Sequence, residues 1–262
     1  MNTKALPDEL RRYKRQIIMP QIGERGQRRL LASTIAIIGL GALGSVIATS
    51  FVRLGIGKVK VVDRDHVELD NLHRQILYDE KDLAAGLPKA TAAAEKLRKM
   101  NSQVKIEPIV AHAGPDNIEN IITDVDLVLD GTDNFETRFL INDACVKHAL
   151  PWIYGGVIAT TGMCMVIIPF KSACFRCLMP QKPPAQSIPT TATHGVLINT
   201  VSIIASLQVM EGLKILLQRE EDLIQKLVQI DVWRGSWTLL EIGRVENDCP
   251  CCGHKKFEFL AR

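Results

Sequence analysis

Ser33-Thr-Ile-Ala-Ile-Ile38-Gly39-Leu-Gly41-Ala-Leu-Gly44 is the stretch of sequence that decides the fold class. Its β-branched first half predicts a buried strand that ends at Gly39, and residues 42–54 then carry apolar side chains at helical spacing. Between strand and helix, the G-x-G-x-x-G pattern lets the backbone pass close to phosphates, whose charge the helix N-terminus favours. The stretch therefore predicts a nucleotide-binding turn, with helix-to-sheet packing as the alternative role of its glycines.

Strands and helices alternate after this turn. Residues 58–62, 104–110 and 126–129 have the composition of strands, and residues 89–100 have the spacing of a helix. Such alternation predicts an α/β fold with a Rossmann-like, doubly wound and mostly parallel sheet.

The pattern changes in the second half of the chain. β-rich runs at residues 152–157 and 163–168 flank a predicted hairpin turn at residues 159–162, and residues 227–241 supply two further strands. Residues 195–217 have the composition of a long helix. A mixed or antiparallel second half is therefore expected.

Prolines gather in one segment of this half. Four of the twelve lie between Pro180 and Pro189, beside Ser and Thr, which predicts an extended exposed loop without regular structure. We interpret residues 178–195 as a loop that crosses the molecule.

Composition excludes disorder, because 47% of the 262 residues are hydrophobic and 23% are charged. Residues 30–52 carry no charge but contain the glycine pattern and polar residues, so a membrane span is rejected. Seven cysteines that include two CxxC pairs, with no signal segment at the N-terminus, favour a cytoplasmic protein.

Positive charge is concentrated at the N-terminus. The first 30 positions hold eight of the 32 Lys and Arg residues and three of the 29 Asp and Glu residues. Such a segment can bind nucleic acid, but Arg and Lys on a short helix are more often a solvated face. A nucleic-acid partner is therefore considered unlikely.

Polar residues that follow the predicted strands favour ATP over NAD. Asp63 ends the second strand, where a carboxylate can accept hydrogen bonds from ribose hydroxyls. Arg74 and Lys89 add two cations on the phosphate side, which a triphosphate needs more than a dinucleotide does. Asp133, after the fourth strand, is a candidate magnesium ligand, whereas Asn134 could instead cap the helix that begins there.

Two cysteine pairs predict a structural zinc site. Cys174-Phe-Arg-Cys177 and Cys249-Pro-Cys251-Cys252 each aim two sulfurs at one point, and four thiolates form a closed tetrahedral site. A redox pair is the weaker interpretation, and Cys251 could replace one of the four ligands. Cys145 and Cys164, on a predicted helix and a predicted strand, are expected to be buried packing residues.

Six motifs together resemble the MoeB/ThiF/HesA family, the bacterial relatives of ubiquitin-activating enzymes. The motifs are Arg12-Tyr-Lys-Arg15-Gln, the 39–44 turn, Asp63-x-Asp65, Asn71-Leu-His-Arg74-Gln75, Pro88-Lys89 and Thr132-Asp133-Asn134. The resemblance runs from about Tyr13 to Gly253, in order and with the family's spacing. It implies ATP-dependent adenylation, with magnesium, of the C-terminal glycine carboxylate of a small ubiquitin-like (β-grasp) sulfur-carrier protein that ends in Gly-Gly, and release of pyrophosphate.

The resemblance also implies roles for individual residues. Asn71, Arg74 and Lys89 should contact the phosphates, and Arg15 should reach into the site of a partner subunit, which implies a homodimer. The expected catalytic set is Arg15, Arg74, Lys89 and Asp133. The expected nucleotide-binding set is Gly39, Gly41, Gly44, Asp63, Asp65, Asn71, Arg74, Gln75, Lys89, Asp133 and Asn134.

One departure from the family concerns the crossing loop. Many relatives carry a cysteine four residues before the glycine that opens the long helix, whereas this chain has Thr191 there and no cysteine at residues 178–194. A hydroxyl cannot replace a thiol of low pKa in a persulfide or thioester. We therefore expect adenylation without a covalent intermediate at this loop, and we interpret His194 as a surface or hinge residue.

The expected organisation is a single adenylation domain over residues 1–262. It comprises a helical arm (1–30), a nucleotide-binding half (31–150) and a carrier-binding half stapled by zinc (151–262). Activation of a small carboxylate or a modified tRNA nucleoside by the same chemistry is the first alternative, supported by the basic arm. An NAD-linked oxidoreductase or an inactive zinc-stapled scaffold is less likely, because no hydride-transfer acid or base is evident.

Overall fold

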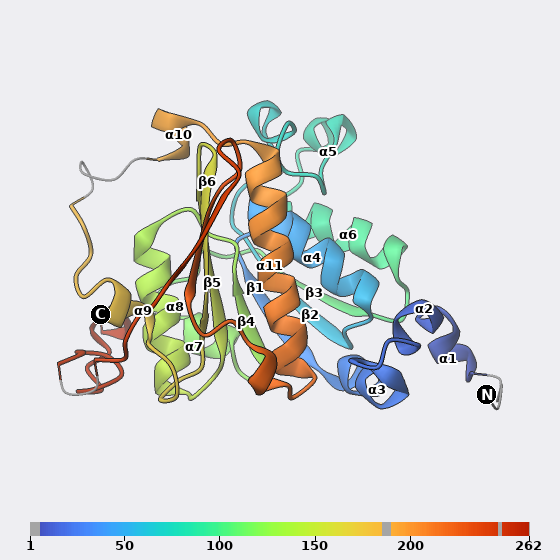
Figure 1. The fold of residues 1–262 in the computed structure, drawn as a ribbon. Coiled ribbons are helices and arrows are strands. Elements are labelled where there is room, and N and C mark those ends of the chain that lie inside the picture. Colours follow the sequence, from blue (N-terminus) through green and yellow to red (C-terminus); the bar gives the residue numbers. More distant parts are fainter. Residues whose placement is uncertain (1–5, 185–189, 246–247, 262) are drawn as a thin grey trace.

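One sheet of eight strands runs through the computed structural model, which describes residues 6–184, 190–245 and 248–261 (Figure 1). The strand order is β3-β2-β1-β4-β5-β6-β7-β8. Pairs from β3 to β5 are parallel, and pairs from β5 to β8 are antiparallel. The strands are β1 (Thr34–Ile38), β2 (Lys58–Val62), β3 (Lys105–Ile109), β4 (Leu127–Asp130), β5 (Trp152–Ile158), β6 (Thr161–Ile167), β7 (Leu227–Asp231) and β8 (Ser236–Leu240). The predicted α/β class, with a mostly parallel sheet and antiparallel strands in the second half, is confirmed.

Helices cover both faces of the parallel part of this sheet. The helices are α1 (Asp8–Arg11), α2 (Lys14–Ile17), α3 (Gly23–Ala32), α4 (Ala42–Leu54), α5 (Glu80–Ala85), α6 (Lys89–Met100), α7 (Ile118–Ile121), α8 (Phe135–Lys147), α9 (Phe175–Leu178), α10 (Thr191–His194) and α11 (Ile198–Leu216). None of the helices in the described ranges is long and apolar enough to cross a membrane.

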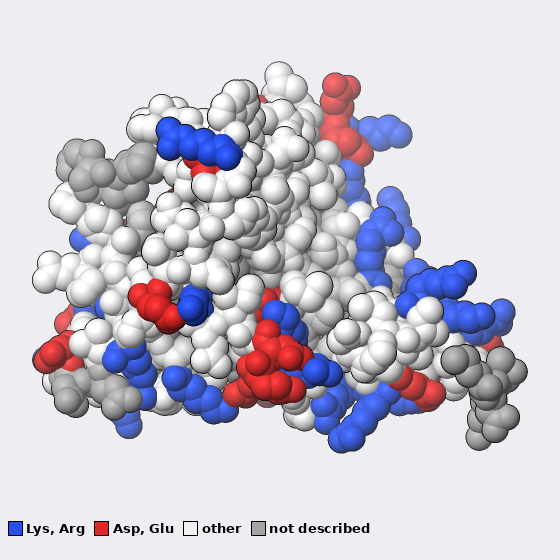
Figure 2. Space-filling model, viewed as in Figure 1, with Lys and Arg blue, Asp and Glu red and all other residues white. Residues whose placement is uncertain are grey.

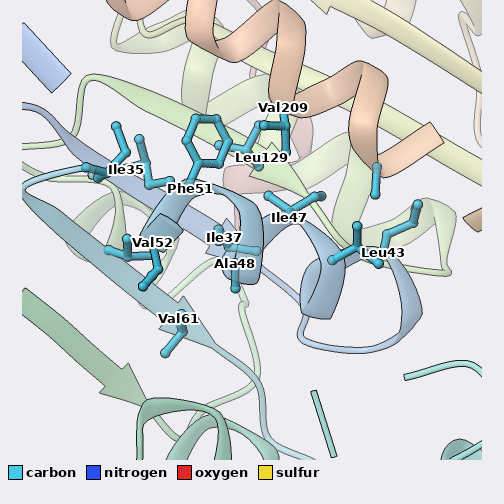
Figure 3. Packing of buried hydrophobic residues seen from close by; sticks show 14 of the residues in the cluster. Ile35, Ile37, Leu43, Ile47, Ala48, Phe51, Val52, Val61, Leu129 and Val209 are labelled. Atoms are coloured by element: carbon cyan, nitrogen blue, oxygen red, sulfur yellow. The ribbon is translucent and has the colours of Figure 1, made fainter. Parts of the chain in front are cut away.

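The core explains why β1 shows no polar alternation. Ile35 and Ile37 pack with Phe51 of α4 on one face (Figure 3), whereas Ala36 and Ile38 pack with residues of α8 on the other. Parallel strands buried on both faces read as continuous apolar runs. The sequence 34–38 therefore fits the middle of a three-layer α/β/α structure.

Two boundaries in the second half differ from the expectations. The hairpin turn after β5 is shorter than residues 159–162, because Ile158 already pairs with Thr161. The long helix begins at Ile198 rather than at residue 195, because Gly195 adopts a left-handed φ of 73° after α10.

The crossing loop contains regular structure that was not predicted. Thr190 and Thr193 form a capping box at the N-terminus of α10, which is a four-residue helical turn. Side-chain capping by threonine stabilises a helical turn without any apolar periodicity, so the proline-rich composition concealed it. Residues 185–189 of this loop lie outside the described residues.

The N-terminal segment is docked on the domain. Leu10 and Tyr13 are buried, and α1 begins at Asp8; residues 1–5 lie outside the described residues. Gln16 and Gln27 both donate hydrogen bonds to the carbonyl oxygen of Leu54 at the end of α4. Basic side chains gather beside these N-terminal helices, whereas the middle of the face over α11 carries almost no charge (Figure 2).

Candidate active site and metal centre

The glycine turn between β1 and α4 is shaped by close backbone contacts. Gly39 has a left-handed φ of 89°, which favours glycine. A Cβ atom on Gly44 would lie 1.9 Å from the carbonyl oxygen of Gly39, so no side chain fits there. Gly39 and Gly41 line the adjacent cleft, but Gly44 is not among its lining residues. Gly44 therefore serves helix-to-sheet packing, the alternative considered for these glycines.

A cleft of about 350 Å³ opens beyond the carboxyl ends of β1, β2 and β4. Ligand sites of open α/β sheets lie at this edge. Ten of the eleven expected nucleotide-binding residues line the cleft, namely Gly39, Gly41, Asp63, Asp65, Asn71, Arg74, Gln75, Lys89, Asp133 and Asn134.

Asp63 holds the turn as well as facing the cleft. Its two carboxylate oxygens accept hydrogen bonds from the N–H groups of Leu40 (2.7 Å) and Asp65 (2.8 Å). Burial raises the pKa of Asp63, and the two N–H donors oppose that rise. Each carboxylate oxygen can accept more than one hydrogen bond, so Asp63 can still receive a ribose hydroxyl.

Two of the side chains that line the cleft carry an amide oxygen without a protein partner. Asn71 and Gln75 are 4% and 3% exposed, and the Oδ1 and Oε1 atoms of their amides are buried without a hydrogen bond. Buried polar atoms are normally satisfied, so these two point to a missing ligand or water. Lys89 is also buried, with its Nζ 3.7 Å from Asp65 Oδ2, and the Arg74 guanidinium donates to the carbonyl oxygen of Asp70.

The segment after β4 carries the candidate magnesium ligand. Asp133 is exposed in the cleft and takes part in none of the ion pairs found among the described residues. Asn134 Oδ1 accepts a hydrogen bond from the Thr137 N–H (2.9 Å), so Asn134 is the N-cap of α8, the alternative considered for it. A free carboxylate oxygen beside a phosphate site is a ligand type that Mg²⁺ prefers.

A buried ion pair under this segment was not predicted. Arg138 Nε lies 3.1 Å from Asp130 Oδ2, and Arg138 Nη2 donates to the carbonyl oxygens of Thr132 (2.7 Å) and Gly155 (3.2 Å). Burial raises the pKa of Asp130, and the Arg138 charge opposes that rise. The pair fixes the backbone on which Asp133 is carried. Its only sequence signal was an acidic residue that ends a buried strand.

Arg15 lies far from this cleft. It is exposed on α2, whose Gln16 contacts the C-terminal end of α4, whereas the N-terminal end of α4 borders the cleft. The 13 residues of α4 span about 20 Å at 1.5 Å per residue. The chain therefore does not bring Arg15 together with the other expected catalytic residues in its own cleft.

Four cysteine sulfurs form one cluster at the start of α9 and the C-terminal segment. The Sγ atoms of Cys174, Cys177, Cys249 and Cys252 all lie within 4.8 Å of one another. The Cys174–Cys249 and Cys177–Cys252 separations are both 3.5 Å. Sulfurs on a tetrahedral zinc at about 2.3 Å are roughly 3.8 Å apart, so the cluster fits a zinc ion.

The other three cysteines lie outside the cluster. Cys251 is fully buried and its sulfur accepts a hydrogen bond from Asn142 Nδ2 (3.2 Å), so it does not replace a member of the cluster. Cys145 and Cys164 are buried, and burial raises the pKa of both thiols. None of the seven cysteines lines the cleft, whereas Thr191 does. His194 is exposed on the same helical turn, near Thr193.

Comparison with known proteins identifies the family of this chain. The ThiF family model matches residues 13–251. The chain belongs to the ThiF family. It is 38% identical to a Bacillus subtilis sulfur carrier protein ThiS adenylyltransferase (95% of this chain, 74% of that protein) and 37% identical to a Thermus thermophilus sulfur carrier protein adenylyltransferase (94% and 92%). The predicted family and the prediction of an adenylyltransferase are confirmed.

Solved structures share the fold of this ThiF-family chain. The crystal structure of Escherichia coli MccB with ATP superposes with a TM-score of 0.74 at 23% identity. The match covers 87% of this chain and 68% of that chain. At this identity the likeness concerns the fold alone.

Proposed function

We propose that this protein uses ATP to adenylate the C-terminal glycine carboxylate of a small ubiquitin-like sulfur-carrier protein. The observation that carries the proposal is the cleft beside the glycine turn. Its lining includes Arg74 and Lys89, two buried amide oxygens without a partner, and the carboxylate of Asp133. Membership of a family whose named relatives are sulfur carrier protein adenylyltransferases supports the carrier as the substrate.

The chemistry follows from the groups that line the cleft. A carboxylate oxygen of the carrier attacks the α-phosphorus of ATP, a new phosphorus–oxygen bond forms, and pyrophosphate leaves with the electron pair of the broken bond. Arg74 and Lys89 stabilise the negative charge that develops on the leaving group. The substrate carboxylate is itself the nucleophile, so the protein contributes orientation and charge rather than a covalent side chain.

Two metal ions belong to the proposal. Asp133 would hold Mg²⁺, which neutralises phosphate charge when bound. The four-cysteine cluster would hold Zn²⁺ as a structural ion, because four thiolates leave no open position for substrate. The seven free thiols suit a reducing compartment such as the cytoplasm.

We infer that adenylation proceeds without a carrier–cysteine intermediate. The group at the crossing-loop position in the cleft is the Thr191 hydroxyl, which ionises far less readily than a thiol. The three cysteines outside the cluster are buried, and the pKa of each of their thiols is raised. The carrier acyl-adenylate would therefore be the activated product that leaves this site.

Exposed apolar residues support a protein partner. Trp233 and Trp237 are 81% and 60% exposed at the β7–β8 hairpin, and Met210 is half exposed on α11. The middle of this face carries almost no charge (Figure 2). Apolar surface of this kind marks contact with other proteins, and it suits either a carrier or a second copy of the chain.

We propose that the active unit is a homodimer in which Arg15 serves the partner's cleft. The separation of Arg15 from its own cleft by the length of α4 supports this assignment. Arg15→Ala and Asp133→Ala are each expected to be inactive, but subunit exchange between them should restore about one quarter of wild-type activity. Half of the random dimers are mixed, and each mixed dimer contains one intact site. No recovery after verified exchange would contradict the shared site.

ATP–pyrophosphate exchange tests the proposed function. The purified protein is incubated with ATP, Mg²⁺ and labelled pyrophosphate, with and without ubiquitin-like carriers that end in Gly-Gly. Exchange should require one carrier and should leave no reducible carrier–protein adduct. Exchange without any carrier but with a small carboxylate or tRNA would favour the alternative that the basic arm supports. Exchange that depends on no added substrate would contradict both.

A further inference from the structure

Tyr78 lies beneath the glycine turn, on its buried side. The side chain is 5% exposed and packs in the same apolar cluster as α4 and β1. Its hydroxyl donates to the carbonyl oxygen of Leu40 (3.0 Å) and lies 3.3 Å from the carbonyl oxygen of Lys89. Tyr78 is not among the residues that line the cleft, so its hydroxyl can affect a nucleotide only indirectly, through the groups that it contacts.

The peptide between Leu40 and Gly41 is held in one orientation. Tyr78 binds the Leu40 carbonyl oxygen of this peptide, and Asp63 Oδ2 accepts at 2.7 Å from the Leu40 N–H, which belongs to the preceding Gly39–Leu40 peptide. A trans peptide is planar, with its C=O and N–H pointing in opposite directions. Because the Leu40 C=O points inward to Tyr78, the Gly41 N–H points outward, and Gly41 borders the cleft. The tyrosine hydroxyl therefore directs a backbone donor toward the phosphate side.

The second contact of the hydroxyl is with the helix that carries the cleft lysine. Lys89 is the first residue of α6, and its N–H donates to the carbonyl oxygen of Asp65 at 2.7 Å. Its ammonium group is buried and lies 3.7 Å from the Asp65 carboxylate. The Tyr78 hydroxyl thus contacts both the glycine turn and the start of α6. These two elements must keep a fixed separation if both are to bind the same phosphates.

We propose that Tyr78 is a positioning residue for the nucleotide phosphates, which sets the direction of the Gly41 N–H and the distance of Lys89 from the glycine turn. The proposal rests on the proposed function in one respect, that ATP occupies this cleft. It differs from a general packing role, because it predicts a loss confined to ligands that carry phosphates.

Tyr78→Phe tests the proposal. The variant keeps the ring in the apolar cluster and removes the hydroxyl. We expect the Kd for ATP to rise about tenfold, since an oriented N–H to a charged phosphate is weakened, while the Kd for adenosine changes less than about twofold. Both constants are measured by isothermal titration calorimetry on the full-length protein, with competition against ATP for adenosine.

Ile56→Val is the matched control. Ile56 is fully buried just after the C-terminal end of α4, opposite the cleft, so the variant loses core packing without touching the turn. Its Kd for ATP should equal that of the wild-type protein.

Three outcomes of these measurements test the positioning role of Tyr78. A rise confined to ATP in Tyr78→Phe supports the positioning role. An unchanged Kd for ATP, or equal losses for ATP and adenosine, would overturn it while the proposed function stands. Failure of the wild-type protein to bind ATP would instead reject the proposed function itself, and the positioning role with it.

Discussion

Replacing Asp133 by alanine is expected to abolish adenylation. Asp133 is an exposed carboxylate of the cleft, and the buried Arg138–Asp130 pair fixes the backbone that carries it. Without this carboxylate the site loses its proposed Mg²⁺ ligand, and phosphate charge is no longer neutralised as pyrophosphate departs. We expect the rate of ATP–pyrophosphate exchange with the carrier to fall by at least about 10²-fold.

Two companion variants separate chemistry from folding. Asp133→Asn keeps the size of the side chain but removes its charge, so it should lose almost as much activity as Asp133→Ala. Asp222→Ala removes an aspartate that pairs with Arg219 outside the cleft, and it should retain wild-type exchange. Thermal unfolding and zinc content should match the wild-type protein in all three. If Asp133→Ala keeps more than about a tenth of the exchange rate, Asp133 does not belong to the reacting site.

Local signals in the sequence were sufficient to predict the first half of the fold. The strand, glycine turn and helix at residues 33–54 each depend on neighbours close in sequence, through β-branching, backbone freedom and apolar spacing. The same holds for the polar residues that follow β2 and β4, because strand ends in a parallel sheet meet at one edge. Ten expected residues therefore lie around one cleft.

Contacts between residues far apart in the sequence could not be predicted from such local signals. Arg138 lies on a helix next to polar residues and is typical of a solvated face, yet Asp130 and Gly155 from two different strands enclose it. Tyr78 gave no signal either, because its function depends on a carbonyl group 38 positions away. The docked position of α2 separates Arg15 from the cleft, and only the folded chain reveals that separation.

The short turn α10 illustrates a different reason for failure. Its stability comes from the Thr190–Thr193 capping box rather than from a buried apolar face. Proline and threonine in the surrounding segment are typical of an extended loop. Composition therefore concealed a structured turn that carries Thr191 into the cleft.

Loss of one cysteine of the cluster is expected to have the largest effect on stability. Cys249 and Cys252 join the C-terminal segment to Cys174 and Cys177 at α9 through the four-sulfur cluster. The same segment is tied to α8 by a hydrogen bond from the Phe259 N–H to Asp143 Oδ2 (3.0 Å). Structural zinc contributes folding free energy directly, so Cys252→Ser should lower the stability by about 3–5 kcal/mol, comparable to the loss of a native cross-link.

This variant should contain no zinc, and its Tm should fall by about 10 °C, at roughly 2–4 °C per kcal/mol for a chain of this size. Limited proteolysis should then cut within residues 241–261, because the cluster no longer holds that segment against α9. Metal content is measured by mass spectrometry and Tm by calorimetry.

Cys251→Ser is the matched control, because it changes the adjacent cysteine by the same single atom. The Cys251 sulfur lies outside the four-sulfur cluster and accepts a hydrogen bond from Asn142, which a serine oxygen can also accept, so one zinc per chain should remain. Loss of zinc from Cys251→Ser together with its retention in Cys252→Ser would assign the ligands differently. Retention in both, with unchanged Tm, would show that the cluster holds no structural metal. The expected contrast arises because the chain directs sulfur 252 toward α9 and sulfur 251 toward α8, although the two residues are neighbours in sequence.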